Sequence, residues 1–422
     1  MIKKVYLLII SIFITLFLLN YCGNNADTTV SNPASVKDDG TWAYILDNKL
    51  ITKDEFEKTY TIFIKMAKIV ALASGVSQGK IDLASQNIEK KRDVLERIIN
   101  SEITFQKALE DPLFKGAEGK SIIENFYKQA LNLYLIEKEV LSKINEPTKD
   151  EIEKFYKKYQ KEFQANGVKD LNSDNNQEKV KNFYTSRKIK KEMEKFNAKL
   201  IGEKRIKYNE SILENYLANK ITKKQVEEDK EGKYWILNID GNNLLLKDVI
   251  YIIDSQLKNT QIAKQISTEA NRAKMAELIL DGFKKAELGY RTAIDKGYDK
   301  NQEGKKFIDL VQKRSVAVYY FTNNILPKSN VKIPTLEDAK KFSSDPSNRK
   351  KVIEFFKTKK IPVTEDNIVK ATYEQLYFEY LNQVNQSQAK FINRLKEAHI
   401  IRISEKFFET ASDKIQKKIL DK

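Results

Sequence analysis

The residue types that most often carry protein chemistry are scarce in this chain of 422 residues. It contains one histidine, His399, and one cysteine, Cys22. A Cys/His zinc site and a disulfide need more of these residues, and one imidazole leaves little room for acid/base or nucleophilic catalysis. The chain has 14 glycines and no GxxxxGK[ST] or GxGxxG loop of the kind that binds nucleotide phosphates. The sequence therefore predicts no catalytic residue, no metal site and no cofactor.

The single cysteine ends an apolar N-terminal segment. Residues 1–22 read MIKKVYLLIISIFITLFLLNYC, in which lysines precede an apolar stretch from Val5 to Leu19. This length is typical of a signal peptide and short for a membrane span. Cys22 follows Leu19 by three residues, which resembles a bacterial lipoprotein signal, although the two residues between them are not the usual small ones. The resemblance implies cleavage before Cys22 and a thioether-linked lipid on its thiol. The alternatives are a cleaved soluble protein and an uncleaved anchor with an incidental cysteine.

The segment after the cysteine and the overall charge indicate where the protein works. Residues 23–40 are small and polar, and predict a flexible tether that holds a soluble body beside a bacterial membrane, on the periplasmic face or the cell surface. The net charge is +16, but only 10 of the 75 basic residues are arginine, the residue on which phosphate and base recognition relies. Lysines interleaved with acidic residues are typical of solvated helix faces. Nucleic acid is therefore not an expected partner.

Aromatic residues offer the other candidate for function. The chain contains 21 Phe, 20 Tyr and 2 Trp. In the predicted helix at 372–381, helical spacing places Tyr373, Tyr377, Tyr380 and Leu381 on one face. Tyrosine buries its ring while its hydroxyl stays hydrated, so this face is a candidate binding surface for unfolded polypeptide. The alternative is that the stripe packs into the core. We interpret a second apolar run, residues 315–321, as a buried strand or helix end.

The elements that position these residues are predicted to be mainly α-helical. Residues 44–51 predict a small hairpin around Asp47-Asn48, and Thr52 with Glu55 forms a capping box that begins a helix. Apolar residues at helical spacing predict more helices. These further helices are predicted in residues 91–110, 122–136, 148–159 and 177–207, the last ending in an extended tip at 205–208.

Several segments of the first half recur in the second half in the same order. The matched pairs are 45–56 with 239–250, 95–108 with 280–293, 195–213 with 390–408 and, more weakly, 147–155 with 334–342. This order predicts internal duplication, with modules at 41–225 and 226–422 that each carry a hairpin; the alternative is that two lysine-rich helical stretches merely look alike. In the same register His399 lies opposite Lys204, which predicts a half-exposed surface position without a functional role.

The order of elements resembles the chaperone module of the SurA and PrsA type of periplasmic foldases. The residues that carry the likeness are ITKDEF at 51–56, LERIINSEITFQKA at 95–108 and TKDEIEKFY at 148–156 followed by Phe163. In that family, the segment that residues 206–210 resemble returns to pack on the opening helices. The likeness covers most of residues 41–217 and, more faintly, 235–410. It implies a helical chaperone fold in each module.

The chain departs from the foldases where their catalytic domain would be. In that family a parvulin prolyl-isomerase domain usually follows the position that Phe163 resembles, whereas here residues 164–177 form a polar segment too short for a domain. Parvulin sites also rely on paired histidines. The resemblance therefore transfers no catalytic residue.

We therefore expect a lipid-anchored, extracytoplasmic chaperone that holds unfolded or nascent envelope proteins without ATP and without isomerase chemistry. A different class is a surface-exposed structural or adhesive lipoprotein on a foldase-derived scaffold, and a third is an active isomerase. A homodimer formed by exchange of opening or closing helices is a further alternative for the assembly.

Overall fold

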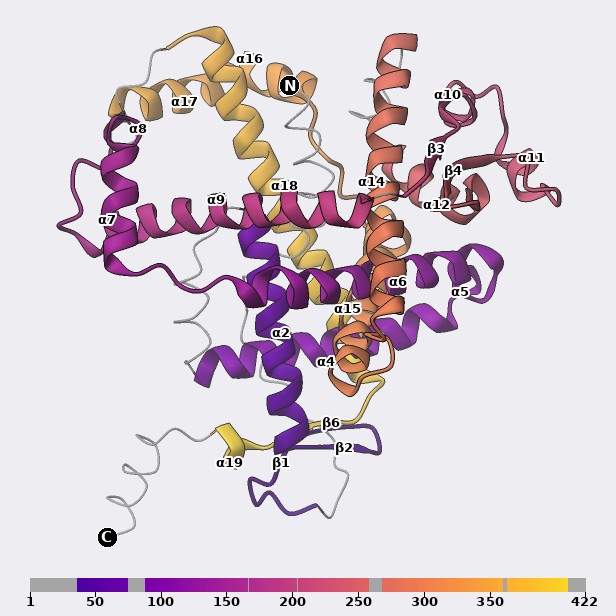
Figure 1. Cartoon of the computed structure of the whole chain (residues 1–422). Coiled ribbons are helices and arrows are strands. Elements are labelled where there is room, and N and C mark those ends of the chain that lie inside the picture. The colour runs from indigo at the N-terminus through magenta and orange to yellow at the C-terminus, as the bar shows by residue number, and fades with distance from the viewer. Residues whose placement is uncertain are drawn as a thin grey trace.

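The computed structural model describes residues 36–74, 88–165, 167–202, 204–257, 268–359 and 363–408. Helices form most of this part of the chain and two small sheets accompany them (Figure 1), so the predicted mainly α-helical fold is confirmed. The predicted signal peptide, Cys22 and most of the predicted tether lie outside these residues. Within them, every helix is too short or too polar to cross a bilayer.

The first half opens with the predicted hairpin. β1 (Trp42–Leu46) and β2 (Lys49–Thr52) pair antiparallel. The predicted capping box is also present: the Thr52 N–H donates to the Glu55 carboxylate over 3.0 Å, and the Glu55 N–H donates to Thr52 Oγ1 over 3.3 Å. The helices and strand that follow are α2 (Lys53–Ser74), α4 (Ile88–Glu110), α5 (Pro112–Lys115), α6 (Ala117–Glu139), η2 (Leu141–Lys143), α7 (Lys149–Lys158), α8 (Gln160–Ala165), α9 (Asp174–Ile201), β3 (Ile206–Tyr208), α10 (Glu210–Leu217) and α11 (Lys223–Glu227).

The second half has a similar order of hairpin, helices and closing strand. Its elements are β4 (Trp235–Ile239), β5 (Asn242–Leu245), α12 (Leu246–Leu257), α14 (Glu269–Asp295), α15 (Gln302–Tyr320), η3 (Phe321–Ile325), η4 (Leu326–Ser329), α16 (Leu336–Ser344), α17 (Pro346–Lys359), α18 (Glu365–Glu397), β6 (Ile401–Ile403) and α19 (Glu405–Phe408). Residues 315–321 are the end of α15 and the first residue of η3, with Val316 and Phe321 buried. The helix-end interpretation of this run is therefore confirmed, and the strand interpretation was wrong.

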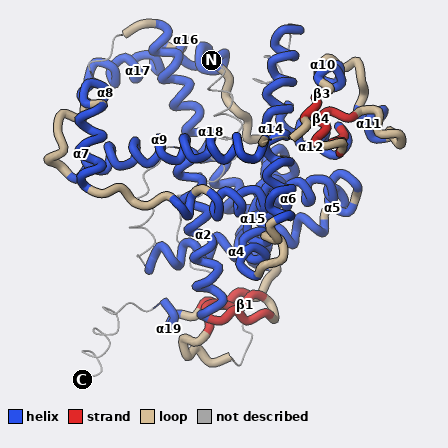
Figure 2. The backbone as a smooth tube through the Cα atoms, in the orientation of Figure 1, coloured by secondary structure: helices blue, strands red, loops and turns tan. Residues whose placement is uncertain are grey.

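Each of the two sheets takes strands from both halves of the chain. β3 pairs with β4 of the second hairpin, and β6 at the end of the chain pairs with β1 of the first hairpin. Figure 2 shows the two sheets at separate ends of the helical body. The foldase resemblance implied that the closing helix, with the segment at 206–210, returns to pack on the opening helices. α9 contacts α2, whereas β3 pairs with the second hairpin, where Ile206 lies opposite Ile239. The module boundary predicted after residue 225 falls inside α11 and stays a prediction.

In each sheet, an aspartate in the hairpin turn binds the segment that leads into the third strand. Asp47 and Asp240 occupy the turns with left-handed φ angles of 53° and 51°. The Asp47 carboxylate accepts the Ile400 N–H over 3.0 Å and lies 3.0 Å from His399 Nδ1. The Asp240 carboxylate accepts a backbone N–H from Arg205 and lies 3.1 Å from Lys204 Nζ. His399 and Lys204 thus hold equivalent positions, and the His399 side chain is 19% exposed.

Helices from both halves also share the central cores. α15 packs on α2, α4 and α6, while α6 also packs on α12 and α14. Tyr134 and Leu135 of α6, both buried, belong to one cluster with Phe307 and Val311 of α15. Burying side chains of this size stabilises the fold by about 1.5–3 kcal/mol each. The halves are therefore interlocked through helices as well as through strands.

Candidate functional site: two aromatic arms

Two groups of helices form arms on the central body. We define the first arm as α7, α8 and α9, and the second arm as α16, α17 and α18. In the first arm, α7 and α8 lie at the end of α9 remote from α14; in the second, α16 and α17 accompany the N-terminal part of α18 (Figure 1). Capping boxes at Thr148 and Thr335 begin α7 and α16. The long helices α9 and α18 then run back to the strands β3 and β6.

The first arm is held together by a cluster of aromatic rings. Tyr156 and Phe163 are buried with Val180, and Tyr156 donates its hydroxyl hydrogen to the Lys169 carbonyl over 2.5 Å. Further rings surround this pair with centroid separations of 4.8–6.2 Å. These outer rings are Phe155, Tyr159, Phe183 and Tyr184. Phe183 on α9 is the outermost, and 41% of its surface is exposed. The cluster therefore presents an apolar edge to solvent.

Sequence reasoning did not select this first-arm cluster. The signal was present, because Phe155, Tyr156, Tyr159 and Phe163 follow one another at helical spacing and an aromatic pair lies at 183–184. The two runs are separated by the polar segment 166–173, and only the packing of α7 on α9 brings them together.

In the second arm, the tyrosines of the predicted face of α18 are partly buried. Tyr373 stacks on Tyr377 with centroids 6.1 Å apart, and Tyr377 lies 5.7 Å from Tyr380. Tyr380 packs against a buried cluster that includes Phe321 and Val384, and burial raises the pKa of both Tyr377 and Tyr380. Leu381 is also partly buried. The helical spacing of these residues is confirmed, and their role in binding stays a prediction.

The most exposed ring of the second arm is one residue away from this face. Phe378 is 64% exposed, more than any other large apolar residue whose exposure the structure describes. Phe183 and Phe378 are also the two exposed phenylalanines among those residues. Each lies 23 residues before the first residue of its closing strand, Ile206 or Ile401. The two arms therefore each present an exposed phenylalanine at the same distance along the chain from the closing strand.

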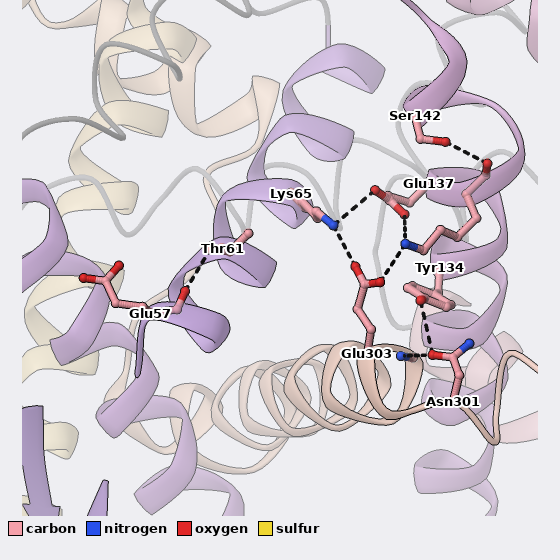
Figure 3. Close-up of polar contacts among 10 residues, drawn as sticks. Glu57, Thr61, Lys65, Tyr134, Glu137, Ser142, Asn301 and Glu303 are labelled. Atoms are coloured by element: carbon pink, nitrogen blue, oxygen red, sulfur yellow. Dashed lines mark hydrogen bonds and ion pairs between the residues drawn. The ribbon is translucent and has the colours of Figure 1, made fainter. Parts of the chain in front are cut away.

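A charged cluster at the crossing of α2, α6 and α15 is a second group of interacting side chains (Figure 3). The Glu303 carboxylate lies 2.7 Å from both Lys65 Nζ and Lys138 Nζ, and each lysine is 3.7 Å from the buried Glu137. A hollow of about 270 Å³ beside it is lined by Lys58, Thr61, Ile62, Lys65, Gln302, Glu303 and Lys306. Both lysines are already paired with carboxylates, so they are not available to bind an anion. Because Glu303 of the second half pairs with Lys65 and Lys138 of the first half, we infer that the cluster stabilises the contact between the halves.

We expect these carboxylates to make the protein less stable in acid. Bonds from Lys138 and Lys65 lower the pKa of Glu303 to about 2, and bonds from Lys296, Tyr298 and Lys143 lower the pKa of Glu139 to about 2. The unfolded chain binds these protons near the ordinary value of 4.5, so the stabilisation is complete above that pH and is lost as the pH falls toward 2. Glu139→Gln should lower the free energy of unfolding by about 2 kcal/mol at neutral pH, measured by urea denaturation.

The matched control is Glu194→Gln. Glu194 pairs with Lys190 over 3.9 Å and both side chains are mostly exposed, so its removal should change the free energy of unfolding by less than about 0.5 kcal/mol. Equal effects of the two substitutions would contradict a stabilising role for the bonds that Glu139 accepts from Lys296 and Tyr298.

Comparison with known proteins identifies no relative of this chain. No family model, no curated protein and no solved structure matches the chain.

Proposed function

We propose that the protein is an extracytoplasmic, ATP-independent chaperone that holds unfolded envelope proteins and performs no prolyl-isomerase chemistry. The observation that carries this proposal is the pair of exposed phenylalanines, Phe183 and Phe378, at the same register of the two arms. A single exposed apolar residue is ordinary on a protein surface. Two rings at equivalent positions, Phe183 beside further half-buried rings and Phe378 one residue from the tyrosine face of α18, are better explained by contact with a partner.

The physical basis of the proposed activity is nondirectional apolar contact. Covering an exposed phenylalanine contributes about 1.5–3 kcal/mol and does not depend on the partner's backbone geometry. Two such contacts on separate arms would bind an unfolded chain and leave a well-folded protein, with few exposed rings, unbound. The link between α8 and α9, residues 166–173, supports the absence of an inserted isomerase domain at that place.

We infer that the two halves derive from one duplicated SurA-like module. Supporting features are the similar order of elements, the same strand arrangement in the two sheets, and the aspartates Asp47 and Asp240 in equivalent turns with equivalent partners. A lipid on Cys22 completes the proposal, since it would hold both arms beside a bacterial membrane. Its test is mass spectrometry of the mature N-terminus, in which acylated Cys22 is the expected result.

The chaperone proposal is tested with purified protein that lacks residues 1–22. We expect it to suppress the aggregation of an unfolded outer-membrane protein at near-stoichiometric ratio in the absence of ATP, measured by light scattering. A folded protein of similar size and charge serves as the control. No suppression would overturn the proposal and favour the adhesive lipoprotein. Prolyl-isomerase activity above background on a short peptide would overturn the exclusion of that chemistry.

A further inference from the structure

An arginine covers the aromatic edge of the first arm. The Arg187 guanidinium carbon lies 4.1 Å from the centre of the Tyr159 ring, 4.8 Å from that of Phe183 and 6.0 Å from that of Phe155. A guanidinium over ring faces is attracted by their electron density and keeps its N–H groups free to meet an anion. Arg187 therefore combines a cation with the apolar surface of the arm.

The ion pair that Arg187 makes within the chain is exposed to solvent. Glu162 Oε2 lies 3.5 Å from Arg187 Nη2, and the two side chains are 58% and 41% exposed. Exposed ion pairs contribute little to stability, because water and salt screen them. A carboxylate from another molecule could therefore take the place of Glu162 at little cost. Glu162 also shows that a carboxylate fits beside this cluster of rings.

The charges around the exposed phenylalanine differ between the two arms. Lys179, Arg187 and Lys190 lie four residues before, four after and seven after Phe183, and share its side of α9. The residues at the same distances from Phe378 on α18 are Glu374, Asn382 and Asn385. The first arm therefore offers an apolar ring in positive surroundings, whereas the second offers a ring in neutral to acidic surroundings.

We propose that the first arm selects extended polypeptide segments in which a large apolar side chain neighbours a carboxylate. The apolar side chain packs on the exposed part of Phe183, and the carboxylate replaces Glu162 on Arg187. The second arm contributes apolar contact without this charge selection. The inference rests on the proposed chaperone function and names the chemistry of the segments that the first arm holds.

The test uses the protein without residues 1–22 and two fluorescent peptides with identical apolar residues. One peptide carries aspartates and the other carries lysines at the same positions, and binding is measured by fluorescence anisotropy. We expect the acidic peptide to bind more tightly. Arg187→Gln should weaken its binding about threefold, because the exposed ion pair with the peptide carboxylate is lost. Glu162→Gln should strengthen its binding about twofold, because the internal competitor is removed.

The opposite signs of these two effects separate binding from a purely structural role, in which both substitutions would act in the same direction. The matched control is Arg349→Gln in the second arm, where Arg349 pairs with Glu365 over 2.6 and 3.0 Å; it should leave the affinity for the acidic peptide unchanged. Thermal melts establish that each variant is folded. If Arg187→Gln unfolds the arm, the affinity of the Glu162→Gln variant for the acidic peptide tests the inference instead.

Two results would overturn the inference: equal affinity for the two peptides, or changes of the same sign for Arg187→Gln and Glu162→Gln. If aggregation is suppressed but the acidic peptide is not preferred, the charge selection alone fails. If aggregation is not suppressed, the chaperone function itself fails.

Discussion

A chain cut between its two halves is expected to stay together in native buffer. The segment 228–234 links α11 to β4, and Lys230 and Glu231 within it are exposed, so a protease recognition sequence can be inserted between them. After cleavage, we expect two bands on a denaturing gel and one peak in size-exclusion chromatography. Separation should require denaturant.

The reason is the exchange of strands and helices between the halves. Cleavage leaves β3 paired with β4 and β6 paired with β1, and α15 of the second fragment stays packed on α4 and α6 of the first. Separating the fragments would expose buried rings such as Tyr134 and Phe307 to water, each at a cost of about 1.5–3 kcal/mol. Two modules joined only by a linker would have no such cost.

A second measurement distinguishes the cut chain from the uncut one. Folding of the cut chain is bimolecular, so its melting temperature should rise with protein concentration. The uncut protein with the same insertion is the control, and its melting temperature should not depend on concentration. Two peaks in native buffer after cleavage would contradict the interlocked arrangement.

The local elements were predictable because their signals lie within a few residues. The hairpin around Asp47-Asn48 was expected from its turn, and the capping box at Thr52 from Glu at the third following position. The long helices were expected from the spacing of their apolar residues. Such signals fix secondary structure but say nothing about which distant segment an element contacts.

The exchange of strands could not be predicted for this reason. β3 reads Ile-Lys-Tyr and β6 reads Ile-Arg-Ile, two alternating segments that would fit either hairpin. The aspartates in the two turns make the same kind of contact, since each accepts a backbone N–H from the residue before its partner strand. The choice of partner depends on the path of the helices between the strands, which the local sequence does not determine.

The candidate site was predictable only in part. The aromatic stripe of α18 was recognised, but helical geometry turns Tyr377 and Tyr380 toward neighbouring side chains and leaves Phe378, about 100° further around the helix, pointing outward. The first-arm cluster needs α7, α8 and α9 together, and the position of Arg187 over its rings follows from that packing. Exposure and stacking are properties of the fold, so spacing alone did not reveal them.

Replacing both exposed phenylalanines is expected to abolish most of the chaperone activity. Phe183→Ser and Phe378→Ser each remove an apolar contact of about 1.5–3 kcal/mol, so each should weaken the binding of an unfolded client about tenfold or more. The double variant should suppress aggregation little better than an unrelated protein in the light-scattering assay. Phe378→Ser should barely change thermal stability, because its ring is 64% exposed.

The matched control replaces exposed apolar residues outside the arms. Leu50 on β2 and Leu109 on α4 are each 40% exposed, close to the 41% of Phe183. The variant Leu50→Ser with Leu109→Ser therefore removes apolar surface without touching either arm, and we expect it to keep its activity. If the two double variants lose activity equally, general surface hydrophobicity explains the suppression and the arms have no special role. If only the phenylalanine variant loses activity, and Phe378→Ser alone loses part of it with a melting temperature close to that of the parent, client contact is assigned to the arms.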